Sequence, residues 1–156
     1  MTEREALAVL RGEDPVRAAQ AAAELWQMWH QSGRPQLDAR LRQGIEEMER
    51  QQLAKADAVF SELIALAPEF AEGWNKRATV RYLAHDYTAS IADCRETLAR
   101  NPHHFGALSG QGLCHMELGQ YREAAALFRQ ALVVHPHLNG ARANLRTALQ
   151  ELVKWN

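Results

Sequence analysis

Four histidines stand beside two prolines, and clusters of histidine can bind metal ions. His103 and His104 follow one proline, while His135 and His137 flank another. A zinc site needs three or four ligands held in a fixed geometry, usually at a recognisable spacing. No such spacing occurs here, and no carboxylate stands among the four side chains. We therefore expect solvated loop histidines, and a metal-binding protein that uses these edge histidines is the least favoured function.

The remaining reactive residue types do not form a catalytic pattern. Cys94 and Cys114 fall in predicted helices of neighbouring segments, where buried reduced thiols are expected and a redox pair is the alternative. The chain has no nucleophile elbow, phosphate-binding loop, dinucleotide fingerprint or paired-carboxylate arrangement. We predict that the protein is not an enzyme and that it binds no cofactor.

Three prolines at a fixed period organise the chain. Pro68, Pro102 and Pro136 stand 34 residues apart, and each closes an apolar run. Proline disfavours a helical conformation in the residue before it, so each marks the end of a helix. A fixed period of this length indicates an array of similar units. Small residues recur 24 and 12 positions before each proline, at Gly44, Ala78, Gly112, Ala56, Ser90 and Ala124. Large residues recur 15 and 8 positions before, at Leu53, Tyr87, Tyr121, Phe60 and Phe128.

This pattern resembles the tetratricopeptide repeat, a helix–turn–helix unit of the same length. The middle unit carries the resemblance at Trp74, Ala78, Tyr87, Ser90 and Pro102. The third unit carries it at Leu108, Gly112, Leu118, Gly119, Gln120, Tyr121, Ala124, Phe128, Ala131 and Pro136. Arg40 departs from the family pattern in the first unit, and Cys94 departs from it in the second. The resemblance implies an all-α helical solenoid, in which antiparallel helix pairs form a right-handed superhelical stack.

The period also sets the predicted domain organisation. Three repeats are expected at 37–70, 71–104 and 105–138, followed by a capping helix and tail at 139–156. Residues 1–36 are predicted to be a degenerate N-terminal helical segment, with helices near 3–10 and 15–31. Extending the period backward places Ala22 at a small position and Trp26 at an aromatic one. We therefore expect Trp26 to pack onto the first repeat, while Trp29 is either buried or part of a contact surface.

The turn inside each repeat needs a residue with a left-handed backbone. Gly119 fills this position naturally in the third repeat. The equivalent residues are Gln51 in the first repeat and His85 in the second. These two turns are expected to be either strained or longer.

The first helix of each repeat lines the inner wall of such a stack. In the tetratricopeptide family this concave groove commonly takes a peptide or a helix, so the resemblance implies a partner-binding groove. The candidate groove residues are Asn75, Lys76, Thr79, Tyr82, Ser109, Gly110, Leu113, Met116 and Asn144. Gly110 lies within a helix at a cost of about 1 kcal/mol relative to alanine, and is either a notch for a ligand backbone or tolerated drift.

The resemblance also implies a specific test for one kind of ligand. Some family members hold a peptide's terminal carboxylate with a clamp of lysine, asparagine and arginine. In one register the clamp positions hold Leu41, Ile45, Lys76, Gly106 and Gly110, and in the other Asn75, Thr79, Gly110, Gly140 and Asn144. Neither set supplies the cations that charge-assisted contacts require, so a chaperone-tail adaptor is disfavoured.

Composition excludes several classes of protein. The net charge is −1, which provides no long-range attraction to nucleic acid or to an anionic membrane. No apolar run approaches the roughly 18 residues that cross a bilayer, and no secretory leader is evident. We expect a cytoplasmic protein, with a processed secreted or periplasmic form as the alternative.

The leading prediction is a non-catalytic interaction module whose groove binds a peptide or helix of a partner protein. The alternative is a self-associating structural scaffold. In that case Trp29 and the apolar end of the first repeat, at Leu41, Ile45 and Met48, form a contact between copies.

Overall fold

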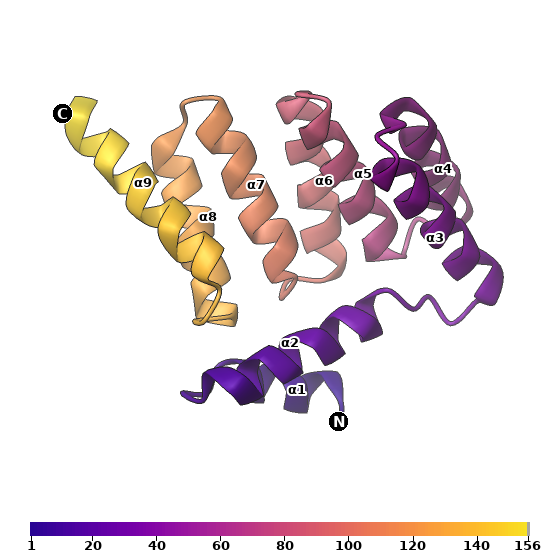
Figure 1. The fold of residues 1–156 in the computed structure, drawn as a ribbon, viewed down its shortest axis with the longest axis horizontal. Coiled ribbons are helices and arrows are strands. Elements are labelled where there is room, and N and C mark those ends of the chain that lie inside the picture. The colour runs from indigo at the N-terminus through magenta and orange to yellow at the C-terminus, as the bar shows by residue number, and fades with distance from the viewer. Residues whose placement is uncertain (156) are drawn as a thin grey trace. The chain divides into compact units, whose positions relative to one another are not determined.

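The structure is a computed structural model in which residues 1–155 are described, and this range contains helices and no strand (Figure 1). The helices are α1 (Glu3–Leu10), α2 (Pro15–Trp29), α3 (Pro35–Glu49), α4 (Leu53–Leu66), α5 (Ala71–Leu83), α6 (Tyr87–Arg100), α7 (Phe105–Glu117), α8 (Tyr121–Val134) and α9 (Asn139–Trp155). The all-α prediction is confirmed. Within the described range, none of the helices combines the length and apolar character needed to cross a membrane.

The chain divides into two compact units. The central unit is Trp29–Pro102 and contains α3 to α6. The terminal unit combines Met1–Met28 with His103–Asn156, so α7 to α9 share it with α1 and nearly all of α2. Each unit is described by itself below.

The core of the central unit forms where α3, α4 and α5 pack together. Pro35 stands in the first turn of α3, where its fixed backbone angle favours a helix start. The buried cluster contains Leu37, Leu41, Ala56, Phe60, Leu63, Ala67, Phe70 and Val80. Ile45 and Met48 pack against this cluster. Burial of these side chains holds the helices of the first repeat together and joins them to α5.

Small residues allow the two helices of a repeat to cross closely. A Cβ atom added to Gly44 would lie 2.3 Å from the ring of Phe60, and one added to Gly112 would lie 2.7 Å from the ring of Phe128. The second repeat has Ala78 in place of the glycine and Cys94 in place of the phenylalanine. In the second repeat, the smaller side chain of Cys94 is therefore matched by the larger Ala78 at the helix crossing.

The turn within each repeat has the same length and the same backbone geometry. Three residues separate the paired helices, at 50–52, 84–86 and 118–120. Gln51 has a φ of 60°, His85 a φ of 63° and Gly119 a φ of 71°. Of the two expectations for the first two turns, the structure supports strain rather than extra length, because a side chain in this region clashes with the following carbonyl oxygen.

Helix α2 packs beside the third repeat within the terminal unit. The Trp26 ring lies 5.6 Å from the His104 ring and 6.4 Å from the Phe105 ring, measured between centroids. The prediction that Trp26 packs onto the first repeat is therefore wrong, and its indole stays 37% exposed. The sequence period placed Trp26 correctly on a helix, but its ring packs against residues at the start of α7.

Candidate functional site

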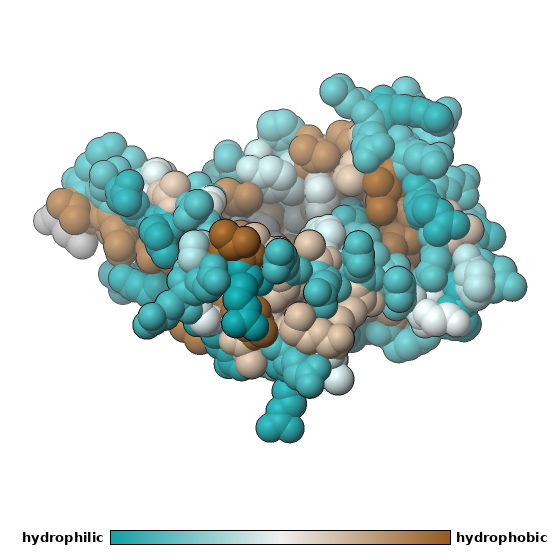
Figure 2. All heavy atoms as spheres, turned by 60° about the horizontal axis from the view of Figure 1, so that its bottom comes forward, coloured by the Kyte–Doolittle hydropathy of each residue, from teal (hydrophilic) through white to brown (hydrophobic). Residues whose placement is uncertain are grey.

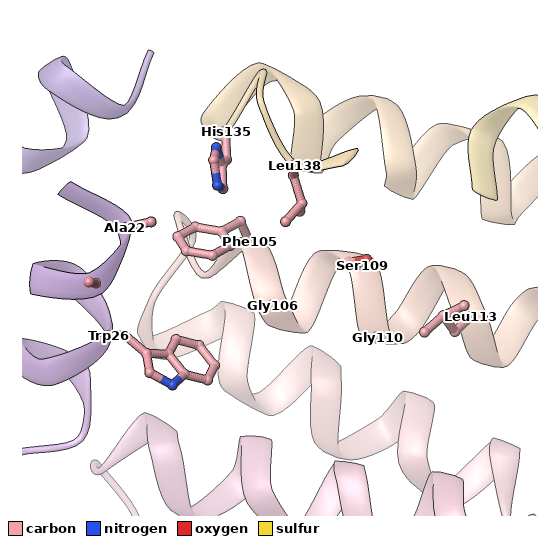
Figure 3. A pocket seen from close by; sticks show the side chains of 10 residues that line it. Ala22, Trp26, Phe105, Gly106, Ser109, Gly110, Leu113, His135 and Leu138 are labelled. Atoms are coloured by element: carbon pink, nitrogen blue, oxygen red, sulfur yellow. The ribbon is translucent and has the colours of Figure 1, made fainter. Parts of the chain in front are cut away.

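An apolar pocket of about 520 Å³ opens in the terminal unit between α2, α7 and the segment that joins α8 to α9 (Figure 3). We call it the Trp26 pocket. It is lined by Ala22, Ala23, Trp26, Phe105, Gly106, Ser109, Gly110, Leu113, His135 and Leu138. Its volume falls within the range of typical ligand sites, about 300–1,000 Å³.

Helix α7 supplies one wall because its lining residues recur every fourth position. Phe105, Ser109 and Leu113 follow one another at this spacing, which places them on one helix face. Gly106 and Gly110 repeat the spacing beside them. The glycines add no side chains, so this part of the wall is recessed.

Helix α2 supplies the opposite wall with two alanines and one large ring. Figure 3 shows Ala22 and Trp26 on α2, across from Phe105 on α7. In Figure 2, where the side that carries α1 and α2 comes forward, hydrophobic side chains are visible among hydrophilic ones over these helices. Val16 is 66% exposed on the same helix, so α2 is not buried on all sides.

Gly106 permits the close contact between α2 and the start of α7. A Cβ atom at this position would lie 3.1 Å from Cε1 of His104 and 3.4 Å from Cη2 of Trp26. His104 is fully buried and caps α7, because its Nδ1 accepts a hydrogen bond of 3.0 Å from the Ala107 backbone N–H. This cap holds the His104 ring beside Gly106 and Trp26.

His135 forms the end of the pocket next to α8. Its side chain is only 7% exposed, and its ring packs edge-on against Phe105 with centroids 5.0 Å apart. Burial lowers the pKa of His135 below its ordinary value of 6.5, and the neighbouring His137 lowers it further. Its Nδ1 is buried without a hydrogen-bond partner among the described residues. The pocket therefore contains an uncharged imidazole at neutral pH.

A hydrogen bond at the outer edge links the N-terminal helices to the C-terminal part of the unit. The Nε2 atom of His137 lies 2.7 Å from the backbone carbonyl oxygen of Gly12, in the turn between α1 and α2. This contact joins residues that are 125 positions apart in the sequence. It fixes the start of α2 and so helps to position the α2 wall.

The structure brings together three of the predicted groove residues on α7. Ser109, Gly110 and Leu113 all line the Trp26 pocket. Met116 is partly buried further along α7, and Asn144 is partly buried on α9; neither is among the lining residues. Sequence reasoning did not identify Trp26, Phe105 or His135 as site residues, because their proximity depends on where α2 docks.

The predicted residues on α5 surround a buried carboxylate in the central unit. Glu72 is fully buried, and its Oε1 accepts a hydrogen bond of 2.8 Å from Nδ2 of Asn75. The Nζ of Lys76 and the Nε2 of His30 each lie 3.6 Å from the same oxygen. Asn75 is itself only 7% exposed. Polar groups that were expected to bind a ligand therefore already pair with Glu72 inside the central unit.

The two other predicted α5 residues lie further along the same helix. Thr79 donates a hydrogen bond from Oγ1 to the backbone oxygen of Asn75. Tyr82 packs edge-on against Tyr87, with ring centroids 5.6 Å apart. Both side chains are partly exposed.

The apolar residues predicted for self-association belong largely to the core. Leu41 is 2% exposed and lies in the buried cluster, while Ile45 and Met48 pack against that cluster. The expectation that Leu41 forms a contact surface is therefore wrong, since α4 and α5 already cover it. Trp29 is partly buried.

The edge histidines and cysteines do not assemble a metal site in the described part of the chain. No group of three or more histidine, cysteine, aspartate or glutamate side chains in residues 1–155 is placed to hold a metal ion. The expectation of solvated loop histidines is wrong for His104 and His135, which are buried, and His137 contacts Gly12. Cys94 and Cys114 are both buried.

Comparison with known families and curated proteins gives one recurring answer. A family model described as "Tetratricopeptide repeat" matches residues 41–104, 76–141 and 109–150. A "TPR repeat-containing protein" of Rhizobium etli is 28% identical over 142 residues, which is 91% of this chain and 70% of that protein. The "Hsp70-Hsp90 organizing protein" of Triticum aestivum is 32% identical over 89 residues, which is 57% of this chain but only 15% of that protein.

Solved structures of low sequence identity share the fold. The first TPR of Spaghetti (RPAP3) bound to the HSP90 peptide SRMEEVD has a TM-score of 0.74 at 19% identity, covering 75% of this chain and 93% of that chain. The type III secretion chaperone SycD of Yersinia enterocolitica, in complex with a peptide of the translocator YopD, has a TM-score of 0.71 at 13% identity and covers 79% and 97%. These likenesses show the architecture of the repeats.

Proposed function

Because the chain belongs to the tetratricopeptide repeat family, we propose that it is a protein-interaction module that binds a peptide segment of a partner protein. The Trp26 pocket on α7 is its main contact site. The exposed side chains of α5, Thr79 and Tyr82, provide a second surface. The partner is a protein, and the module acts without a cofactor.

The observation that supports this proposal is the convergence of predicted groove residues on a preformed pocket. Ser109, Gly110 and Leu113 lie on one face of α7, and a partly exposed indole lies opposite them. The walls are helices, so the contact residues are held in place before a ligand arrives. A preorganised site loses less conformational entropy on binding than a flexible one.

The wall chemistry argues against the acidic-tail ligands seen with some relatives. The RPAP3 domain was solved with an HSP90 peptide, and its ligand ends in carboxylate groups. Here the corresponding positions hold leucine, isoleucine, glycine, asparagine and threonine, apart from Lys76, which lies beside the buried Glu72. A carboxylate ligand would therefore find no unopposed cation at these positions.

We also propose that the module is non-catalytic. The polar side chains of Ser109 and His135 line the same pocket, but no hydrogen bond joins them within the described structure. Serine acts as a nucleophile only when an adjacent base accepts its proton. The other walls consist of alanine, glycine, leucine and aromatic residues, with no acid–base pair among them.

A displayed library of random heptapeptides, selected against the full chain, tests the function. We expect enriched peptides to bind the parent protein, and a Leu113→Arg variant to bind them at least about tenfold more weakly because it places a charge in the pocket. Val133→Arg is the matched control, since Val133 is 71% exposed on α8. A selection that yields no binder, or equal binding by Leu113→Arg, contradicts the proposal.

Self-association is the second candidate function. Because Leu41 is buried in the core, a contact between copies would have to use other residues. Sedimentation over a concentration series measures it directly. A monomer at all concentrations removes this candidate and leaves the peptide-binding function unaffected.

A further inference from the structure

We propose that the Trp26 pocket binds one bulky apolar side chain of the partner peptide, namely phenylalanine, leucine or methionine, and that α2 forms the selective half of the site. This inference rests on the proposed peptide-binding function. It assigns the ligand chemistry, and it makes α2 part of the binding site rather than a spacer before the repeats.

The size of the pocket fits a large side chain together with adjoining backbone. An apolar cavity of about 150 Å³ is enough to hold benzene. The Trp26 pocket measures about 520 Å³ and is open to solvent. A phenylalanine or leucine side chain therefore fits with room for the peptide backbone at the mouth.

The lining excludes charged anchors. None of the lining residues is Asp, Glu, Lys or Arg, and His135 is uncharged at neutral pH because burial lowers its pKa. A carboxylate or ammonium group entering the pocket would lose its hydration without gaining an ionic partner. An apolar side chain loses no such hydration, so the pocket discriminates between the two classes.

The partly exposed indole of Trp26 is the surface that a ligand would cover. Tryptophan is enriched at the energetic centres of protein interfaces because it buries a large apolar area at low entropic cost. Trp26 is 37% exposed even though its ring already contacts His104 and Phe105. Part of this residue is therefore open to solvent at the pocket that it lines.

His135 adds a buried polar atom at the end of a largely apolar site. Its side chain is more than nine-tenths buried, and its Nδ1 has no hydrogen-bond partner among the described residues. An unpaired buried polar atom is unfavourable, so a ligand group that pairs with it improves the complex. A backbone amide next to the apolar side chain is the kind of ligand group that could pair with it.

Filling the pocket from α2 is the sharpest test. Ala23 lines the pocket and is solvent-exposed, so Ala23→Leu adds volume inside the pocket while the buried core is unchanged. We expect Ala23→Leu to weaken binding of the selected heptapeptides by at least about tenfold. Gln20→Leu is the matched control, because Gln20 is exposed on α2 and does not line the pocket. It should change affinity by less than about twofold.

The peptide series gives an independent readout. One enriched heptapeptide is resynthesised with phenylalanine, leucine, alanine, glutamate or lysine at its anchor, and each is titrated against the parent protein by tryptophan fluorescence. We expect phenylalanine and leucine to bind best, and glutamate and lysine to bind at least about tenfold more weakly. Trp26→Phe should remove most of the fluorescence change.

The outcomes separate this inference from the proposed function. Peptides that bind unchanged to Ala23→Leu but lose affinity for Tyr82→Ala overturn the inference and keep the function. A preference for glutamate at the anchor also overturns it. A protein that self-associates, and that Ala23→Leu converts to a monomer, shows that the occupant is a second copy and overturns it as well. A library without binders contradicts the function itself.

Discussion

The second and third repeats have the same helices but opposite chemistry at equivalent positions on their first helices. Positions 34 residues apart hold Glu72 and Gly106, Lys76 and Gly110, Arg77 and Gln111, and Thr79 and Leu113. The second repeat has three charged side chains and one hydroxyl at these positions, whereas the third has two glycines, an amide and a leucine. The same repeat backbone can therefore carry either charged side chains that pair with one another or an open apolar pocket.

In the central unit, charged pairs join three helices. Arg77 donates two hydrogen bonds of 2.9 Å to the Asp93 carboxylate, and this pairing raises the pKa of Arg77. Arg81 lies 3.1 Å from Asp57 and 3.2 Å from Asp93. The network connects α4, α5 and α6, and it gives these helices a fixed register.

In the terminal unit, glycine leaves space that another helix uses. Gly106 takes the position equivalent to the buried Glu72, and the ring of Trp26 approaches that position from α2. Here α2 provides apolar contact in place of ionic pairing. The pocket is the part of this space that α2 does not fill.

Removing Asp93 should have the largest effect on stability. Asp93→Ala leaves Arg77 and Arg81 without their shared carboxylate in a site where the aspartate is 2% exposed. Breaking a buried ion pair in this way costs about 3–5 kcal/mol. Urea unfolding measures the loss. Glu96→Ala breaks an exposed pair with Arg100 and should cost less than about 1 kcal/mol. Equal effects of the two variants would contradict the comparison.

Adding a methyl group at a helix crossing should have the next largest effect. Gly112→Ala places a Cβ atom 2.7 Å from the fully buried ring of Phe128, so the ring or the helices must shift. Overpacking of this kind destabilises by about 1–3 kcal/mol. Gly140→Ala is the control, because nothing lies within 4 Å of its added Cβ. If Gly112→Ala unfolds at the parent's urea midpoint, the crossing is looser than described.

Replacing a strained turn residue should stabilise the protein slightly. Gln51 is exposed and has a φ of 60°, a conformation that glycine adopts without strain. We expect Gln51→Gly to raise the free energy of unfolding by about 0.5–1 kcal/mol, since relief of strain exceeds the added chain entropy. Gly119→Ala should have the opposite sign. Thermal unfolding of both variants checks whether the first and third turns are equivalent.

The smallest expected effect is a pH dependence from His135. Its folded-state pKa lies below 6.5, so the unfolded chain binds a proton first as the pH falls. The free energy of unfolding is therefore unaffected by His135 above the unfolded-state pKa. It decreases as the pH falls through 6.5, and it levels off below the folded-state pKa. His135→Gln should flatten this part of the stability profile. An unchanged profile would show that other groups cause the dependence.

The sequence predicted the helices, and it predicted that Ser109, Gly110 and Leu113 share one helix face, because both features follow from local spacing. Pro68, Pro102 and Pro136 end helices through their own backbone restriction, so their period predicts the repeat directly. Leu113 was assigned to the groove because its helix face follows from the spacing. The repeat boundaries follow from the same period and stay a prediction.

The missed features depend on contacts between distant parts of the chain. Nothing in the residues around Trp26 specifies that its ring meets His104 and Phe105. The burial of Glu72 likewise depends on Asn75, together with His30 from the segment after α2. Such pairings form only once the helices are packed, and a one-dimensional pattern does not encode them.

The terminal unit draws on both halves of the chain, and this affects its biosynthesis. About 80 residues lie between Trp26 and Phe105, and a ribosome adds roughly 5–20 residues per second. The nascent α2 therefore spends about 4–16 s without its docking surface. During that interval, chaperones and other nascent chains can bind its alanines and indole. The cellular yield of folded protein therefore depends on how well α2 is protected from such contacts until the third repeat has been translated.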